Sequence, residues 1–361
     1  MPSGVYGGPV PLSGTQERAS AFLLAQAEQE FAEVRHLMRF SREAGFTGVS
    51  EQQCGDIFAR ATLAHLFLDI AQLLGRTELA MLFRRIARSE ADYIARSKVA
   101  NRSGGWSYFP GLPELPPDAD SLAAALSLFV RIAPEHVELC RKAVEIVLAG
   151  ADPDGSFETW IVAPDDVPFE RARMQWAIQN YWGTGTDPDV LAHFYHAIWL
   201  SAPDRYREVV RRGVSKLIDM QQPDGSWRAT WYEGPAYGTG LALRLLQELG
   251  IADDARMRAR RFLLDTQHQD GTWGDDASAP LQTAFSLAAL SEMEPGPASV
   301  EISRGVRALR ERQLANGSWI PSPWIRMEIG RATGKILHVA TYQSAVLTTA
   351  FCLRAVLSGS Q

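Results

Sequence analysis

Hydrophobic side chains recur along most of this chain at the spacing of an α-helix. Phe58, Thr62, Leu66 and Ile70 lie four positions apart, and the segment 122–129 repeats the pattern. Residues at this spacing share one face of a helix. The alternation of apolar and polar residues that is typical of a half-buried strand is weak throughout. The pattern therefore predicts an all-α fold.

A short phrase also recurs at a fixed interval in the second half of the chain. The segments MQQPDGSW, TQHQDGTW and RQLANGSW end at Trp227, Trp273 and Trp319, so their turn glycines are 46 residues apart. Weaker copies end at Trp106 and Phe157. A period of this length with two helices in each unit is typical of stacked helical hairpins. We interpret each phrase as the turn that joins one hairpin to the next.

The five phrases and two flanking helices, expected at about 15–38 and 336–358, give roughly twelve helices. Such an array closes naturally into a single (α/α)6 barrel, with six inner and six outer helices, in which the first helix pairs with the last. The segment 336–353 lacks Asp, Glu, Lys and Arg, yet it contains His, Thr, Gln, Ser and Tyr. We therefore predict a buried helix there and not a membrane span.

No linker divides the chain, so we expect one domain over 15–361. The Gly-, Pro- and Ser-rich segment 1–14 precedes it and is expected to be flexible, without a visible signal peptide. A net charge of −6 without a basic block argues against nucleic acid as a partner. Three widely spaced cysteines argue against a disulfide framework and against a cysteine-based zinc site. They indicate a reducing, cytoplasmic environment.

Two carboxylates stand directly before an apolar run in the segment PDADS, where Asp118 and Asp120 are followed by 122–129. One interpretation is structural. Asp118 would cap a helix and Asp120 would lie in its first turn, each contributing about 1 kcal/mol or less. The other interpretation is chemical, because paired acids at the mouth of an apolar helix can serve as an acid site.

The phrase Q-x-x-D-G-x-W resembles the QW motif of triterpene cyclases, the squalene–hopene cyclase family. PDADS resembles the Asp-x-Asp-Asp acid motif of that family, with Asp118 and Asp120 in its first and second acidic places and Ser121 as a departure in the third. DPDVLAH resembles the family segment Asp-x-x-x-His, which carries over to Asp189 and His193. The resemblance runs from about residue 55 to the end of the chain.

The segment 224–240 resembles a further family segment that places aromatic rings in the active site, here Trp231 and Tyr237. Family members usually have a second, inserted barrel, for which this chain has no room. The chain therefore resembles a single-domain class II terpene cyclase, as described for some bacterial meroterpenoid pathways. The resemblance implies an isomerase that needs neither a redox cofactor nor a metal.

The resemblance also implies roles for the residues. Asp120 would protonate an alkene or epoxide, His193 would activate it, and Asp118 and Asp189 would support them. Aromatic faces stabilise the resulting carbocations by roughly 0.5 to 2 kcal/mol each. The ring candidates, beside the two named above, are Tyr108, Phe109, Trp160 and Tyr342.

Other functions stay open at this point. A protein prenyltransferase needs a zinc ligand cluster that the cysteines do not offer, and a glycoside hydrolase could use Asp120 and Asp189 as its carboxylate pair. An isoprenoid-binding barrel without activity is a third alternative, which Ser121 favours. As substrate we expect a prenylated aromatic compound or a terminal epoxide, with a prenyl diphosphate as the alternative. A substrate this hydrophobic suggests that the protein contacts a membrane peripherally. The sequence leaves the oligomeric state open.

Overall fold

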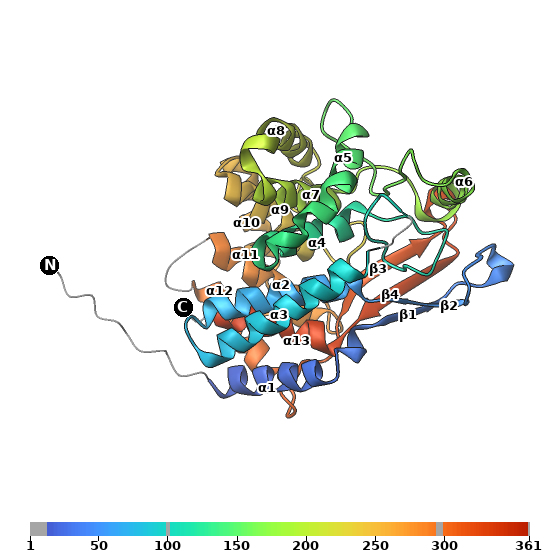
Figure 1. Ribbon diagram of the computed structural model, residues 1–361. Helices are drawn as coiled ribbons and strands as arrows, with labels where there is room; N and C mark the ends of the chain where they lie inside the picture. Colours follow the sequence, from blue (N-terminus) through green and yellow to red (C-terminus); the bar gives the residue numbers. More distant parts are fainter. Residues whose placement is uncertain (1–12, 99–101, 294–298, 360–361) are drawn as a thin grey trace.

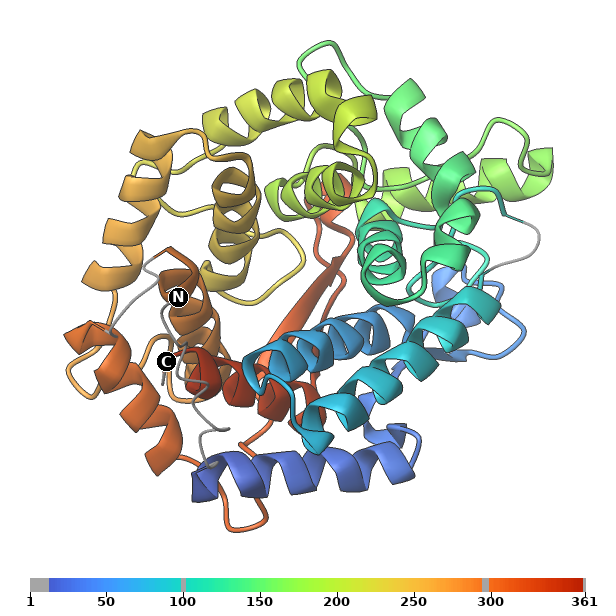
Figure 2. The same cartoon turned by 60° about the vertical axis from the view of Figure 1, so that its left-hand side comes forward.

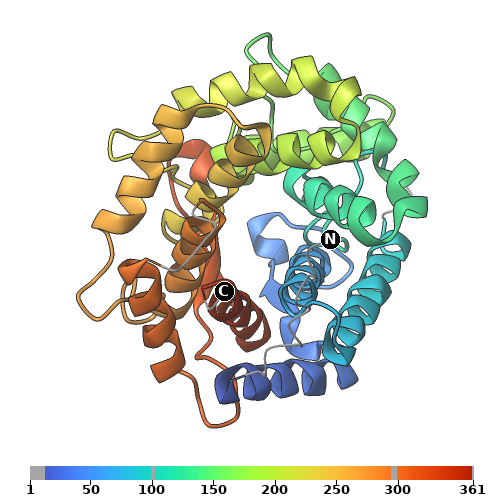
Figure 3. The same cartoon turned by 90° about the vertical axis from the view of Figure 1, so that its left-hand side faces the viewer.

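Two concentric rings of helices make up most of the protein. The computed structural model describes residues 13–98, 102–293 and 299–359. Figure 3 looks along the axis of the rings and Figure 2 shows them obliquely. Contacts between neighbouring helices run right round the inner ring. Its members are α2 (Ile57–Leu73), α4 (Ala119–Ile132), α7 (Pro188–Ser201), α9 (Ala236–Leu249), α11 (Ala279–Met293) and α13 (Ala345–Ser358).

The outer helices cover the inner ring and alternate with it along the chain. They are α1 (Gly14–Glu28), α3 (Glu78–Arg96), α5 (Arg141–Ala149), α8 (Pro203–Asp219), α10 (Asp253–Asp265) and α12 (Val300–Glu311). The first helix, α1, packs on the last, α13. The predicted all-α (α/α)6 barrel is thus confirmed. No helix in the described part of the chain is long and apolar enough to cross a membrane.

The repeat phrases join each outer helix to the next one around the ring. The side-chain amide of Gln221 donates to the carbonyl of Gly225 in its own turn, at 2.9 Å, and to that of Ala255 at the start of α10, at 2.8 Å. Gly225 has a φ of 95°, and a Cβ at this position would lie 2.4 Å from the carbonyl oxygen of Arg258. The turn therefore needs glycine both for its conformation and for its close approach to the neighbouring helix.

The same pair of bonds recurs in the next two phrases, from Gln267 to Gly271 and Glu301, and from Gln313 to Gly317 and Thr15. Because Thr15 belongs to α1, the last phrase closes the ring with the interaction that joins the earlier helices.

The tryptophan of each phrase completes the end of the preceding outer helix. The indole N–H of Trp227 donates to the carbonyl of Leu217 at 2.7 Å, in the last turn of α8, where helix carbonyls lack partners within the helix. Trp273 and Trp319 do the same for α10 and α12. All three rings are buried, as expected for residues that pack beside a turn.

A chain of ion pairs joins five of the six inner helices near their C-terminal ends. Asp69 of α2 accepts from Arg131 of α4 at 2.6 Å and from Arg354 of α13 at 2.9 Å. Arg354 also donates to Glu292 of α11, to which Arg244 of α9 donates at 3.0 Å. Burial opposes ionisation of Asp69, yet the arginines hold its pKa well below the ordinary value. Five of the inner helices are thus linked by charge.

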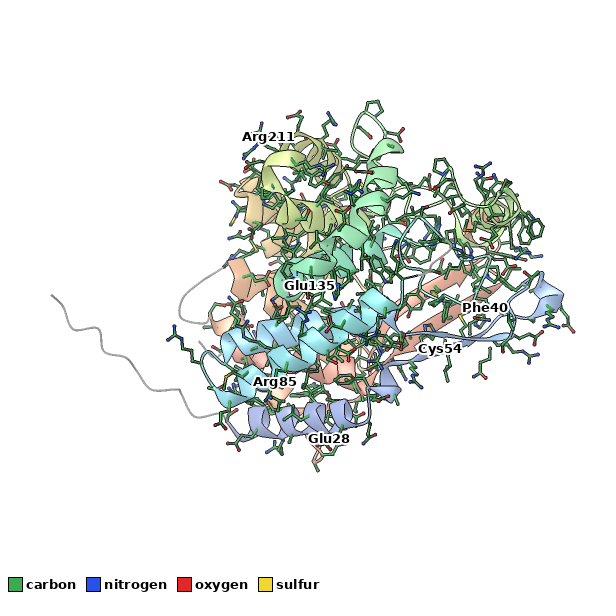
Figure 4. The ribbon with its side chains drawn as sticks, in the orientation of Figure 1. Glu28, Phe40, Cys54, Arg85, Glu135 and Arg211 are labelled. Carbon is green, nitrogen blue, oxygen red and sulfur yellow. The ribbon has the colours of Figure 1, made fainter. Side chains whose placement is uncertain are left out.

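Two antiparallel hairpins cover the end of the barrel at which the inner helices begin. One pairs β1 (His36–Arg39) with β2 (Gln52–Gly55), and the other pairs β3 (Pro323–Ile329) with β4 (His338–Gln343). Both extend to the right in Figure 1, and the labels Phe40 and Cys54 mark the first of them in Figure 4.

These hairpins correct two predictions. The helix expected at 15–38 ends at Glu28, because Glu30 and Phe31 adopt left-handed backbone angles, with φ of 53° each, and stop it. The helix expected at 336–358 begins only at Ala345. The residues before it form β4, since their backbone groups find partners in β3.

A further helix, α6 (Pro168–Ala177), and a π-helical turn, Ile178–Trp182, lie outside the two rings. The prediction of one domain over 15–361 stays a prediction. Of the segment expected to be flexible, 1–14, residues 1–12 lie outside the described residues, while Ser13 caps α1.

We expect Arg354→Met to lower the free energy of unfolding by about 2 to 3 kcal/mol, because Asp69 and Glu292 lose a shared counter-charge inside the protein. Urea denaturation measures this. Arg141→Met, which removes exposed pairs with Glu138 and Glu145, should cost less than about 1 kcal/mol. Equal losses of unfolding free energy for the two variants would contradict a structural role for this chain of ion pairs.

Candidate active site

Asp118 caps the inner helix α4. Its Oδ1 accepts from the backbone N–H of Ser121 at 2.6 Å, and its Oδ2 accepts from the Ser121 hydroxyl at 2.9 Å. The structural interpretation of this acid is therefore correct. Burial raises the pKa of Asp118 to about 7, and the nearby Asp120 adds to the effect, while the bonds from Ser121 oppose it.

Asp120, in the first turn of the same helix, has a partner at each carboxyl oxygen. Its Oδ1 lies 2.5 Å from Nδ1 of His193, which belongs to the neighbouring inner helix α7. Its Oδ2 accepts a short hydrogen bond from the hydroxyl of Tyr232. The structure thus brings together Asp120 and His193, the pair that the sequence motifs suggested, and adds a tyrosine that they did not.

Asp189 lies in the first turn of α7 and is completely buried. Its Oδ1 accepts from the backbone N–H of Thr230 at 3.2 Å, and its Oδ2 has no hydrogen-bond partner among the described residues. Burial, with Asp187 and Asp120 nearby, raises the pKa of Asp189 well above its ordinary value. The acid borders the pair of Asp120 and His193 without a hydrogen bond to either.

Asp187, which the sequence analysis did not single out, also belongs to this group of acids. Its carboxylate accepts from the hydroxyl of Thr159 at 2.7 Å and from the indole N–H of Trp231 at 2.9 Å. The guanidinium of Arg331 lies 3.5 Å from the same carboxylate and 4.8 Å from the Trp231 ring centre. Asp187 therefore holds the Trp231 ring in place.

A mostly apolar cavity of about 50 Å³ adjoins Asp120, and we call it the aromatic chamber. No lysine or arginine is among the described residues that line it. The rings of Trp160 and Trp231 meet there edge to face, with 5.3 Å between their centres. Its lining comprises Phe58, Tyr108, Phe109, Leu115, Asp118, Asp120, Ser121, Thr159, Trp160, Trp182, Trp231, Tyr232, Ile325 and Met327.

Four of the six predicted ring residues line this chamber: Tyr108, Phe109, Trp160 and Trp231. The other two lie elsewhere. Tyr237 packs on Tyr232, with 4.3 Å between ring centres, and faces a second cavity inside the barrel. Tyr342 stacks on His36, and its hydroxyl donates to the carbonyl of Val34 at 2.6 Å.

The residues that the sequence analysis missed come mainly from irregular segments. Tyr232 follows the matched Trp231 directly, so its position in the segment was the one available signal. Trp182 comes from the π-helical turn, and Ile325 and Met327 come from the β3–β4 hairpin. Neither element carried a motif.

In the described part of the chain, one group of side chains has the ligand spacing of a metal site. It comprises Asp92, Glu135 and His136, at α3 and the turn before α5. Arg88 pairs with both of its carboxylates. This group lies apart from the acids around the aromatic chamber, none of which belongs to it.

A sequence model of the squalene–hopene cyclase C-terminal domain matches residues 73–331, more than two thirds of the chain. The chain belongs to this family. The matched range includes four of the predicted site residues: Asp118, Asp120, Asp189 and His193.

Similar proteins include drimenyl diphosphate synthase of Streptomyces showdoensis, 28% identical over 64% of this chain and 41% of the relative. Ent-copalyl diphosphate synthase of a Streptomyces strain is 32% identical over a segment that covers 33% of this chain and 24% of the relative. The chain thus spans less than half the length of these curated relatives. A variant of the type II terpene cyclase MstE from Scytonema, solved with its substrate geranylgeranyl dihydroxybenzoate, has a similar fold (TM-score 0.67, 19% identity, 96% of each chain).

The raised pKa of Asp118 in the cyclase-family barrel predicts a dependence of stability on pH. An ordinary aspartate ionises near 3.8, whereas the folded carboxyl ionises near 7. Between these values the folded state holds a proton that the unfolded state has lost, so Asp118 lowers stability as the pH rises through this window.

The stability of Asp118→Asn, expressed as its free energy of unfolding minus that of wild type, should therefore rise by on the order of 2 to 4 kcal/mol from pH 4 to pH 8. Urea denaturation at both pH values checks this. The exposed substitution Asp204→Asn is the matched control. If the difference in unfolding free energy between Asp118→Asn and wild type were the same at both pH values, the raised pKa of Asp118 would be contradicted.

Proposed function

We propose that this protein is a class II terpene cyclase. It protonates the terminal alkene or epoxide of a linear isoprenoid and closes rings through carbocations. The observation that carries the proposal is the position of Asp120, held by His193 and Tyr232 at the wall of an apolar aromatic chamber. Membership of the squalene–hopene cyclase family supports it.

The chemistry needs an acid that is both protonated and readily ionised. Alkenes are very weak bases, so the carboxylate must be stabilised as the proton leaves. The O–H bond of Asp120 breaks, a C–H bond forms at the alkene, and a tertiary carbocation results. The imidazole of His193, 2.5 Å from Oδ1, stabilises the carboxylate. Asp118, which accepts both hydrogen bonds of Ser121, and the buried Asp189 are supporting acids.

The chamber then has to guide the cation without trapping it. The rings of Phe58, Trp160, Trp182 and Trp231 offer π faces at its wall, and each ring that faces a cation stabilises it by roughly 0.5 to 2 kcal/mol. The two acids in its lining, Asp118 and Asp120, accept hydrogen bonds, which lowers their tendency to combine with the cation.

We infer that the substrate is a prenylated aromatic compound or a terminal epoxide. The similarity in fold to MstE, which was solved with a prenylated dihydroxybenzoate, supports this class. The similarity to drimenyl and copalyl diphosphate synthases keeps a prenyl diphosphate as the alternative. A linear C15 or C20 chain is larger than the chamber of about 50 Å³.

Two competing functions fit the site less well. A glycoside hydrolase needs two carboxylates facing a cleft, whereas Asp189 is completely buried. A barrel without activity would not need an acid between an imidazole and a phenol at the wall of an apolar chamber. Ser121, the departure that favoured it, donates to Asp118, which caps α4.

We further propose that the hairpin end of the barrel contacts a membrane peripherally. The turns of both hairpins meet the α6 region: Trp176 approaches Gly45, and the backbone N–H of Gly330 donates to the carbonyl of Tyr181 at 2.9 Å. The elements that carry the exposed apolar side chains of this end, α6 and the two hairpins, lie on the right in Figure 1. These side chains are Leu37, Val49, Val167, Phe169, Trp176, Ile336, Leu337 and Val339.

The cyclase proposal is tested by mass spectrometry of products from farnesyl and geranylgeranyl diphosphates, prenylated hydroxybenzoates and terminal epoxides. Wild type should give a cyclic isomer of unchanged mass from one class. Asp120→Asn should lose at least roughly 100-fold in rate, because an amide cannot supply the proton. Asp254→Asn, on the exposed face of α10, should keep the wild-type rate.

Cyclisation that survives in Asp120→Asn would place the acid elsewhere. Failure of wild type to convert any of these substrates would contradict the proposed activity and favour a binding protein.

The membrane proposal is tested by sedimentation with vesicles of phosphatidylcholine and phosphatidylglycerol. Replacing Phe169 and Leu337, which are 68% and 56% exposed, by glutamate should lower binding about tenfold or more, since each change removes apolar surface and adds a charge. Met257→Glu on α10, also at a 56% exposed position, is the control and should bind like wild type. Equal binding of all three proteins would contradict the proposal.

A further inference from the structure

We propose that Tyr232 is a positioning residue for the acid. Its phenol donates to Oδ2 of Asp120 and stabilises the carboxylate that remains when Asp120 gives its proton to the substrate. The inference rests on the proposed function, and it adds a second hydrogen-bond donor to the pair of Asp120 and His193.

The geometry assigns a separate oxygen to each partner. His193 faces Oδ1 at 2.5 Å, while the Tyr232 hydroxyl lies at Oδ2. Each carboxyl oxygen has two lone pairs, so the acidic proton and a hydrogen bond can share one oxygen. In the protonation step the O–H bond of Asp120 breaks and the C–H bond of the substrate forms. The phenol keeps its own proton throughout.

Backbone hydrogen bonds fix the position of the segment that carries the Tyr232 phenol. Tyr232 is only 4% exposed and forms an isolated bridge with Ile325 of β3. On either side of it, the N–H of Glu233 donates to the carbonyl of Trp324 at 2.8 Å, and that of Arg326 donates to the carbonyl of Trp231 at 2.9 Å. The segment that carries Tyr232 is therefore attached to β3 by one bridge and its two flanking hydrogen bonds, which restricts the movement of the ring.

Aromatic neighbours fix the ring itself. Tyr237 lies 4.3 Å away between ring centres, and Trp324 and Phe58 lie at 5.9 and 6.1 Å. In this setting the phenol stays neutral, because burial, and then the charge of Asp120, raise the pKa of Tyr232 well above its ordinary value. A neutral phenol can donate a hydrogen bond at any working pH.

The residue in the third acidic place of the Asp-x-Asp-Asp motif explains why a second donor to Asp120 is useful here. Ser121 occupies it, and both its N–H and its hydroxyl are used by Asp118. Ser121 thus gives no hydrogen bond to Asp120. Stabilisation of the Asp120 carboxylate then depends on the two residues from other elements, His193 of α7 and Tyr232.

The first test replaces Tyr232 by phenylalanine and by 3-fluorotyrosine, whose phenol is the stronger donor. We expect Tyr232→Phe to lower kcat by roughly 10- to 100-fold, the effect of removing a hydrogen bond to a charged group, with KM changed less than about threefold. The 3-fluorotyrosine protein should match or exceed the wild-type kcat. A residue that only fills space would give equal kcat for tyrosine and phenylalanine, which would overturn the proposal.

Tyr195→Phe is the matched control. It also removes a buried phenol, one that donates to the carbonyl of Gly155 at 2.6 Å away from the chamber. It should lower thermal stability to a similar extent and leave kcat unchanged.

A second test needs no turnover. The ¹⁹F resonance of 3-fluorotyrosine at position 232 should shift in Asp120→Asn and stay in place in Asp118→Asn, since of these two acids Asp120 is the one hydrogen-bonded to the phenol. An unmoved resonance in Asp120→Asn would overturn the inference. Should wild type convert no substrate, the proposed function fails, and this spectrum still decides the role of Tyr232.

Discussion

The glutamine side chain that reaches from each of the last three repeat turns to the next outer helix is the interaction on which the closure of the barrel depends. Gln221, Gln267 and Gln313 each join their own turn to the start of the following outer helix, and the last of them reaches Thr15. Because this closes the ring, the inner helices begin together at one end. Acids in the first turns of α4 and α7 are thereby brought into one site, although they are about 70 residues apart in sequence.

Charge is divided between the two ends of the barrel. The end with the hairpins holds buried carboxyls whose partners are mainly hydroxyl, indole, amide and imidazole groups, and the aromatic chamber lies beside them. One guanidinium, that of Arg331, pairs with Asp187 there. Near the other end, Arg131, Arg244 and Arg354 neutralise Asp69 and Glu292. A cation formed in the chamber is thus kept apart from the arginines that stabilise the barrel.

Burial and hydrogen bonding also give neighbouring acids different roles. Asp118 has a pKa near 7 and both oxygens on Ser121, and Asp189 is held away from solvent with a raised pKa. Asp120 alone among them is bound by two donors from separate helices and loops, His193 and Tyr232. The same residue type therefore serves as cap, as buried support and, in our proposal, as acid.

The sequence by itself determined the helical period, the 46-residue repeat and the acid pair, because local spacing and turn residues fix these features. It also suggested four rings of the chamber wall through its motifs. The tertiary structure decided the two hairpins, because their strands carry only a weak alternation of apolar and polar residues and gain their hydrogen bonds by pairing with each other. Only the fold could show that Tyr232 binds Asp120 and that Tyr342 packs on His36, because both contacts join residues more than 100 positions apart, where no sequence period reaches.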